Sequence, residues 1–158
     1  MNELAKPRAG VIDIGSNTIK ILIGEKRNAA IHILADETVE CRISAGMYAD
    51  PPLLADAAME KAVEAVRILL GKAGEIGDFP VEIVATSALR DATNRDTFAE
   101  KLRNAVSLPL KILSGDEEAQ GIARGVGEER GLDPMSEYTV SDLGGGSLEW
   151  IYRREGRG

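Results

Sequence analysis

The sequence predicts an α/β protein in which a β-rich beginning is followed by alternating helices and strands. Near the N-terminus apolar and polar residues alternate with the period of strands, and further along apolar residues recur at the four-residue spacing of helices. A third observation is that residues 13–15 and residues 142–144 share the pattern Asp-x-Gly, each time between two apolar stretches. This repetition predicts an internal duplication, with two similar hairpins facing each other across a cleft.

Four strands are expected before the first helix. Residues 9–14 form a short apolar strand that we expect to be buried on both faces, and residues 18–24 form the second strand of a hairpin. Residues 30–35 and 38–43 are expected to be two further strands, separated by a turn at Asp36-Glu37. The isoleucines of the second strand occupy alternate positions and predict its buried face: Ile19, Ile21 and Ile23.

A long helix is expected to begin at Asp50, because an N-cap residue followed by proline is typical of a helix start. Glycines at positions 71, 74 and 77 are expected to end it, and a strand follows at residues 81–86. The apolar stripe of this helix has four-residue spacing: Leu54, Ala58, Ala62, Val66 and Leu70.

The polar loop at residues 85–94 connects that strand to a helix at residues 96–106. In open α/β sheets ligands bind where strands end, and Arg90 in this loop carries the forked guanidinium group that suits a phosphate. A surface ion pair between Arg90 and Asp91 is the alternative interpretation.

The last helix follows a strand at residues 109–113 and begins with a capping box, Ser114 at the N-cap and Glu117 three residues later. Acidic residues in its first turn suit the positive helix N-terminus, so they do not by themselves indicate catalysis. The helix is expected to end near Gly131. Its inward residues are predicted to be Ala119, Ile122, Ala123 and Val126.

Composition excludes several classes of function. The 158 residues are 44% hydrophobic, which suits one domain or slightly more, and the net charge of -7 argues against a nucleic-acid partner. The single cysteine, Cys41, excludes an internal disulfide and a cysteine metal cluster, and suits a cytoplasmic location. The single histidine, His32, is expected to face solvent from a strand, which argues against a Ser-His-Asp mechanism. The sequence has no apolar run of membrane-spanning length, so no membrane partner is expected.

Three consecutive glycines follow Asp142 and suggest a phosphate-binding loop. Without Cβ atoms, backbone N–H groups of such a loop can turn toward one point and hold phosphate oxygens. The Asp142 carboxylate at the strand end could hold Mg²⁺, and Ser147 and Glu149 add a hydroxyl and a second carboxylate. A flexible hairpin without a ligand is the alternative interpretation.

Four segments together resemble the exopolyphosphatase / guanosine pentaphosphate phosphohydrolase (Ppx/GppA) family. They are residues 13–17, 85–94, 114–119 and 142–149, and the resemblance covers about residues 10–152. It implies the actin-like, acetate kinase/Hsp70-like fold, with two ribonuclease H-like α/β domains and the active site in the cleft between them. Residues 1–130 are then expected to form domain I, and residues 131–158 a linker and the first hairpin of domain II.

The resemblance also implies a role for each candidate residue. Glu118 is expected to be the catalytic base that activates the attacking water, and Asp142 and Glu149 are expected near the cofactor, Mg²⁺. The implied substrate is inorganic polyphosphate or guanosine pentaphosphate (pppGpp), from which a terminal phosphate is released. The expected phosphate-binding residues are Asp13, Gly15, Ser16, Asn17, Arg90, Gly144, Gly145, Gly146 and Ser147.

The length of the chain departs from the family pattern, because family members are expected to carry a whole second domain after the glycine loop. Only 16 residues follow Asp142 here, so we expect a fragment or a shortened protein. Its last ~25 residues are expected to be mobile, or packed on a neighbouring chain as in a homodimer, because an isolated hairpin is marginally stable.

Two other functions remain open at this stage. The Asp-x-Gly loops alone also fit an ATP-using sugar or acetate kinase or an actin-like ATPase of the same fold. A non-enzymatic phosphate- or nucleotide-binding module is the third hypothesis. The segments at residues 85–94 and 114–119 favour the phosphoanhydride hydrolase.

Overall fold

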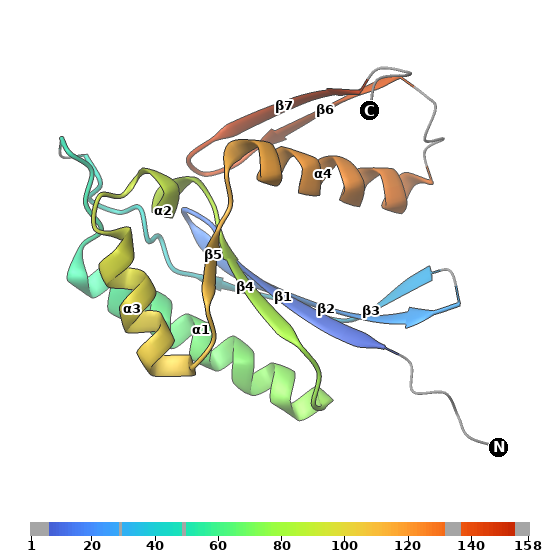
Figure 1. Cartoon of the computed structure of the whole chain (residues 1–158), viewed down its shortest axis with the longest axis horizontal. Coiled ribbons are helices and arrows are strands. Elements are labelled where there is room, and N and C mark those ends of the chain that lie inside the picture. The colour runs from blue at the N-terminus through green and yellow to red at the C-terminus, as the bar shows by residue number, and fades with distance from the viewer. Residues whose placement is uncertain (1–6, 29, 49, 132–136, 154–158) are drawn as a thin grey trace.

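A computed structural model describes residues 7–28, 30–48, 50–131 and 137–153 of the chain, and this part contains a five-stranded and a two-stranded sheet. The larger sheet has the order β3-β2-β1-β4-β5 (Figure 1). Its first three strands are antiparallel, whereas β4 is parallel to β1 and β5 is parallel to β4. The strands are β1 (Arg8–Ile14), β2 (Thr18–Arg27), β3 (Ala30–Glu40), β4 (Val81–Ala85) and β5 (Leu110–Ile112), with β6 (Tyr138–Leu143) and β7 (Leu148–Arg153) in the smaller sheet.

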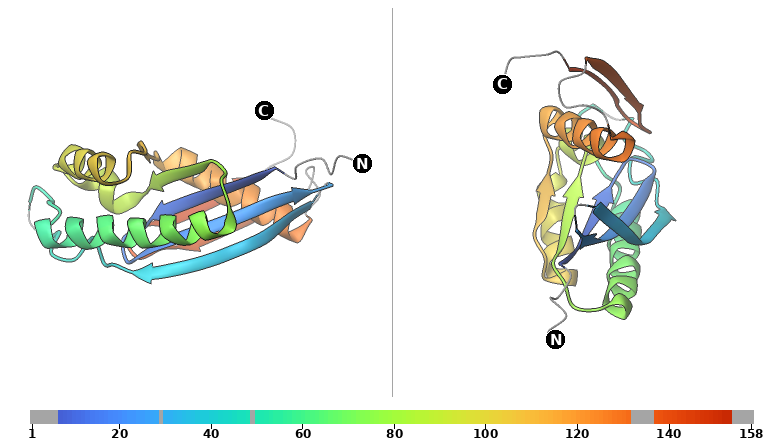
Figure 2. Two further views of the ribbon diagram at one scale, coloured as in Figure 1. Left: turned by 90° about the horizontal axis from the view of Figure 1, so that it is seen from below. Right: turned by 90° about the vertical axis from the view of Figure 1, so that its right-hand side faces the viewer.

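Four helices connect these strands in the described part of the chain. They are α1 (Asp56–Ile76), α2 (Ser87–Asp91), α3 (Arg95–Val106) and α4 (Gly115–Arg130). Helices α1 and α3 contact each other and pack on the large sheet, whereas α4 lies alongside the β6–β7 hairpin (Figures 1 and 2). The predicted boundary between two domains at residue 130 stays a prediction.

The core lies between the large sheet and helices α1 and α3. Ile19, Ile21 and Ile23 of β2 are fully buried, as their alternation predicts. They belong to one apolar cluster with residues of the helices, each worth about 1.5–3 kcal/mol when fully buried. The large helix residues in this cluster are Met59, Val66, Leu69, Phe98 and Leu102.

The predicted turn at Asp36-Glu37 is wrong, because β3 runs without interruption from Ala30 to Glu40. Strand β2 is long enough to pair with all of it, so Asp36 faces Leu22 and Glu37 faces Ile21 in the ladder. The irregularity lies elsewhere: the register shifts between Ile23 and Gly24, which is a β-bulge.

The predicted start of the first helix is also wrong, because α1 begins at Asp56 rather than after Asp50. The reason is a clamp on the preceding segment. The Asn94 side chain accepts a hydrogen bond from the Leu54 backbone N–H and donates one to the Leu54 carbonyl, each at 2.9 Å. Leu54 is therefore buried, but it lies in the segment before the helix and not in the helix itself. The buried residues of α1 have mixed three- and four-residue spacing: Met59, Ala62, Ala65, Val66, Leu69 and Ala73.

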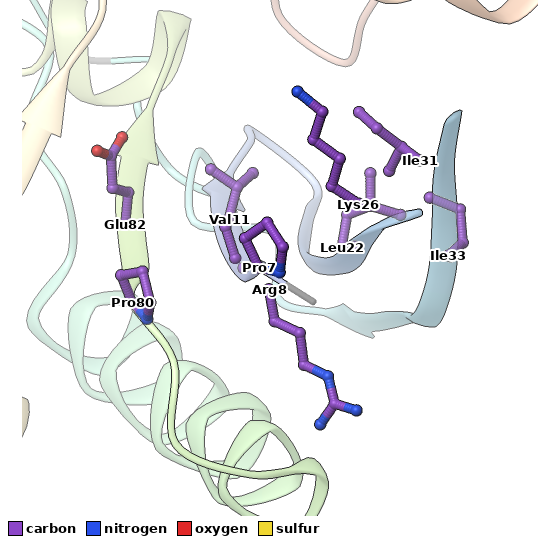
Figure 3. Close-up of a pocket in the computed structure, with 12 residues that line it drawn as sticks. Pro7, Arg8, Val11, Leu22, Lys26, Ile31, Ile33, Pro80 and Glu82 are labelled. Carbon is purple, nitrogen blue, oxygen red and sulfur yellow. The ribbon is translucent and has the colours of Figure 1, made fainter. Parts of the chain in front are cut away.

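Strand β1 is buried on one face only, contrary to the prediction. Ile12 and Ile14 are fully buried, but Val11 on the opposite face is 37% exposed. Val11 lies with Leu22, Ile31 and Ile33 along an open apolar groove of about 500 Å³ (Figure 3). The helices α1 and α3 cover the other face of the sheet. The alternation of apolar residues in the sequence could not predict that the face with this groove is left uncovered by them.

Among the later elements, the predicted loop at residues 85–94 contains the short helix α2, whereas the helix predicted at residues 96–106 and the capping box of the last helix are found. Glu117 Oε2 accepts a hydrogen bond from the Ser114 N–H at 2.9 Å, and the Glu117 N–H donates one to Ser114 Oγ at 3.2 Å, so the capping box is confirmed. The residues predicted to face inward from α4 are only half-buried, because this helix packs on the narrow β6–β7 hairpin. In the hairpin Leu148 and Trp150 are exposed.

Each helix in the described ranges is too short or too polar to cross a membrane.

Candidate functional site

The first candidate loop connects β1 and β2, and its carbonyl groups are anchored to the rest of the fold. The Asn17 carbonyl accepts hydrogen bonds from the N–H groups of Cys41 and Arg42 at 2.9 and 2.8 Å. The Ser16 carbonyl accepts from the N–H and the hydroxyl of Ser44. The loop closes with a hydrogen bond from the Gly15 N–H to the Thr18 carbonyl at 3.0 Å, so its backbone is held firmly.

The second candidate loop connects β6 and β7 and repeats this closure. The Gly144 N–H donates to the Ser147 carbonyl at 2.9 Å, which corresponds to the bond that closes the first loop. The flanking registers also match: Asp13 pairs with Lys20 across the first hairpin, and Asp142 pairs with Glu149 across the second. The structure thus confirms the repeat that the two Asp-x-Gly patterns predict.

The two loops face each other at very short range. A Cβ atom at Gly146 would lie 2.5 Å from Ser16 Oγ and 3.1 Å from Ser87 Oγ, and one at Gly145 would collide with the Asn17 side-chain amide. Real Cβ atoms do not approach other atoms so closely, so only glycine fits at these positions without a shift of the opposite loop. The glycines therefore allow the two loops to share one space.

Backbone N–H groups at the tips of both loops are available to a ligand. In the described part of the chain, the amides of Ser16, Asn17, Gly145 and Gly146 have no protein acceptor, whereas neighbouring carbonyls are used. Successive N–H groups without protein acceptors can form a concave site for an anion. The arrangement is therefore suited to phosphate oxygens.

A polar cavity of about 380 Å³ lies between the loops and collects most of the predicted residues. Arg90 and Gly146 are not among its lining residues. The predicted residues that line it are Asp13, Gly15, Ser16, Asn17, Glu118, Asp142, Gly144, Gly145, Ser147 and Glu149. The cavity brings together residues from both ends of the chain, although the role of each residue stays a prediction.

The carboxyl group of Asp13 lies largely buried at the edge of the cavity. Burial raises its pKa above the ordinary value of 3.8, and the negative charges of Glu118 and Asp142 add to this effect, while Lys20 opposes it. Asp13 Oδ1 is fully buried and has no hydrogen-bond partner among the described residues. An unpartnered buried carboxylate oxygen is unfavourable, so this position is suited to a cation or a bound water.

The same oxygen-rich chemistry fits Mg²⁺ held together with a substrate. Asp142 and Glu149 face each other as cross-strand partners, and like charges in that position repel unless a cation lies between them. Among the described residues, however, no group of three or more potential ligands could hold a metal by itself. Mg²⁺ commonly uses one or two carboxylates plus water and substrate phosphates, which is compatible with this arrangement.

Arg90 has a different partner from both of those considered for it. Its Nη1 donates to Glu118 Oε2 at 2.9 Å and to the Leu113 carbonyl at 3.0 Å. The ion pair is largely buried, with the side chains 28% and 12% exposed. The structure therefore shows Arg90 paired with Glu118 and not with Asp91. The guanidinium group of Arg90 does not line the cavity.

Five cavity residues were missed by sequence reasoning: Thr18, Lys20, Thr86, Ser87 and Leu143. A signal existed for Lys20, because strand alternation places it on the face opposite Ile19 and Ile21, directly across from Asp13. Thr86 and Ser87 lie where β4 ends, the position at which ligands of α/β sheets bind. Their burial and the 3.1 Å contact between the Ser16 and Ser87 hydroxyls could not be read from the sequence.

Solved structures with the same fold are found in several proteins. A Ppx/GppA family member from Aquifex aeolicus matches with a TM-score of 0.82 and 23% identity, over 94% of this chain and 48% of that one. An exopolyphosphatase from Cytophaga hutchinsonii matches with a TM-score of 0.78 and 28% identity, over 95% and 47%. The ethanolamine utilization protein EutJ from Carboxydothermus hydrogenoformans shares the fold with a TM-score of 0.58 and 16% identity, over 99% and 51%.

These matches confirm the actin-like α/β fold predicted from the resemblance. The chain spans about half the length of each of these solved structures. Independently, the model of the Ppx/GppA phosphatase family matches residues 22–156, which is most of the chain. The chain belongs to the Ppx/GppA phosphatase family.

Proposed function

We propose that the cavity binds the terminal phosphates of inorganic polyphosphate or guanosine pentaphosphate and hydrolyses the last phosphoanhydride bond. The observation that carries this proposal is the pair of facing loops with unpaired N–H groups at Ser16, Asn17 and Gly145, which all line the cavity. The family and the similar exopolyphosphatase from Cytophaga hutchinsonii support a phosphatase in general.

In the proposed reaction water attacks the terminal phosphorus, and the bond from phosphorus to the bridging oxygen breaks. Glu118 orients this water and accepts its proton, because its carboxylate lines the same cavity as both loops. The loop N–H groups and Lys20 hold the phosphate oxygens on which negative charge is distributed. Orthophosphate and a polyphosphate shorter by one unit, or ppGpp, are the products.

Mg²⁺ is proposed as the cofactor, held near Asp142 and Glu149, with the buried oxygen of Asp13 close by. When bound, it would neutralise phosphate charge in a cavity that otherwise carries four carboxylates. The carboxylates then serve to position the cation, and the loop amides to position the phosphates.

The test is phosphate release from long-chain polyphosphate, pppGpp and ATP in the presence of Mg²⁺. The unchanged chain is expected to release phosphate from polyphosphate or pppGpp. Glu118→Gln is expected to lower that rate by about 10²–10⁴-fold, because the amide cannot accept the proton.

Glu117→Gln is the matched control. Glu117 is the adjacent acid, but its carboxylate is bonded to the Ser114 N–H and Lys111 on the exposed side of α4, and glutamine also serves in a capping box. This variant should keep its rate within about twofold of the unchanged chain, as surface substitutions usually do. Equal release by the Glu118→Gln variant would contradict the assignment, and binding without release would favour a phosphate-binding module.

A further inference from the structure

Arg90 is joined to the start of α4 at two points. Its Nη1 donates to Glu118 Oε2 and to the carbonyl of Leu113, at 2.9 and 3.0 Å. Leu113 is the residue before the N-cap Ser114, and the Glu118 N–H donates to the Ser114 carbonyl in the first helical turn. One guanidinium group therefore fixes both where α4 begins and where the Glu118 carboxylate lies.

The position of Arg90 is itself fixed from the other side. Its N–H donates to the Thr86 carbonyl within the short helix α2, and its carbonyl accepts a hydrogen bond from Arg95 Nη1 at 2.9 Å. Helix α2 follows β4 of the large sheet, whereas α4 lies with the β6–β7 hairpin. Arg90 thus connects the part of the fold that carries the first loop with the part that carries Glu118 and the second loop.

Arg90 is separated from the cavity in which the phosphates are proposed to bind. Glu118 lines the cavity between the loops, but Arg90 does not. The guanidinium group contacts the carboxylate at one oxygen, Oε2, so the second oxygen, Oε1, is not used by this ion pair. Arg90 Nη1 is already engaged by two protein acceptors in a partly buried ion pair, so this nitrogen is not free for a phosphate.

The charges around Glu118 explain why such a partner is needed. Asp13, Asp142 and Glu149 line the same cavity, and the described part of the chain gives an ion pair to Glu118 alone among these four carboxylates. The positive charge of Arg90 offsets the repulsion that the other carboxylates exert on Glu118, and the ion pair holds the Glu118 side chain in one position.

We propose that Arg90 is a positioning residue that holds the Glu118 carboxylate in place, and that it is not a phosphate ligand. The inference rests on the proposed function, because it assigns a role to Arg90 in a reaction in which Glu118 orients the water. It replaces the expectation, based on family resemblance, that Arg90 contacts the phosphate chain.

The kinetic test uses Arg90→Lys and Arg90→Ala, with Arg103→Ala, at an exposed position of α3, as a matched control that should leave kcat unchanged. Arg90→Ala is expected to lower kcat by about 10–100-fold, as outer positioning partners do, with KM nearly unchanged. Arg90→Lys is expected to restore part of kcat, because an ammonium group can still pair with Glu118. In the Glu118→Gln background, Arg90→Ala should cause no further loss of kcat. A KM raised about tenfold with unchanged kcat would instead identify a phosphate ligand and overturn the proposal.

A second measurement does not depend on turnover or on substitution of Arg90. In the ¹⁵N-labelled unchanged chain, the guanidinium signal of Arg90 is expected to stay in place when tripolyphosphate and Mg²⁺ are added until saturation. The same signal is expected to shift in the Glu118→Gln variant without any ligand. A shift on tripolyphosphate binding, together with no shift in Glu118→Gln, would overturn the proposal. Absence of phosphate release by the unchanged chain would count against the proposed function alone, since this signal still decides the role of Arg90.

Discussion

At the scale of single residues, the buried carboxyl group of Asp13 lowers the stability of the fold. Its pKa is raised, first by burial and then by the charges of Glu118 and Asp142, so the charged carboxylate is unfavourable in the folded protein. For an acid whose pKa is higher in the folded state than in the unfolded state, the free energy of unfolding falls as the pH rises above the ordinary value of 3.8. At neutral pH the buried Asp13 carboxyl group therefore destabilises the fold.

We predict that Asp13→Asn raises the melting temperature at neutral pH in the presence of a chelator, by about 2–4 °C for each kcal/mol regained. The gain should vanish below pH 3.8, where the native carboxyl group is protonated in the folded and unfolded states. Asp78→Asn, an exposed loop change, is the control and should leave the melting temperature unchanged. A melting temperature lowered at neutral pH in the Asp13→Asn variant would show that Asp13 contributes to stability instead.

Individual site residues could be predicted only where a short sequence pattern is repeated in the chain or where strand alternation fixes the face on which they lie. Asp13 and Asp142 stand out because each precedes a glycine at the same spacing. Lys20 could have been placed opposite Asp13 from strand alternation alone. The pairing of Arg90 with Glu118 could not be predicted, because Glu118 lies 28 residues away and is brought to Arg90 only by the folding of β5 and α4.

At the scale of elements, the β1–β2 pair carries a buried carboxylate far from the cavity. Glu25 is 2% exposed, and it accepts hydrogen bonds from Arg27 at 2.5 Å and from its cross-strand partner Arg8 at 2.8 Å. These two arginines lower its pKa from 4.5 to about 2, Arg27 having the larger effect. Because the folded-state pKa lies below the unfolded value, the stabilisation is complete above pH 4.5 and is lost as the pH falls toward 2.

We predict that Glu25→Gln flattens the loss of stability between pH 4.5 and about 2. The measurement is the urea midpoint at several pH values. Glu40→Gln is the control, because Glu40 and its partner Arg42 are both mostly exposed and such pairs contribute little. If Glu25→Gln and Glu40→Gln gave the same pH profile, the two-arginine clamp would not stabilise the sheet.

Elements were predictable where a local signal decides them. The capping box at Ser114 and the isoleucine alternation of β2 depend on neighbouring residues, and both are confirmed. The start of α1 was missed because Asn94, 40 residues from Leu54, holds the preceding segment extended. The predicted turn in β3 failed for a similar reason, since the partner strand β2 stabilises residues that look like a turn in isolation.

At the scale of the whole molecule, the candidate site is assembled from segments that are distant in sequence. The first loop belongs to the large sheet, and the second loop and Glu118 belong to the hairpin and the helix beside it (Figure 1). The chain spans about half the length of the solved structures it matches, yet both loops and the carboxylates lie within it. The proposed function therefore requires that the two loops bind one ligand together.

The most direct measurement of that claim is an amide ¹H–¹⁵N titration of the unchanged chain with tripolyphosphate in the presence of Mg²⁺. The amides of Ser16, Asn17, Gly145 and Gly146 are expected to shift together, with one dissociation constant. Gly146→Ala should weaken binding, because its methyl group would push against Ser16 Oγ, 2.5 Å away. Shifts confined to one loop, or separate dissociation constants for the two loops, would contradict a shared phosphate site.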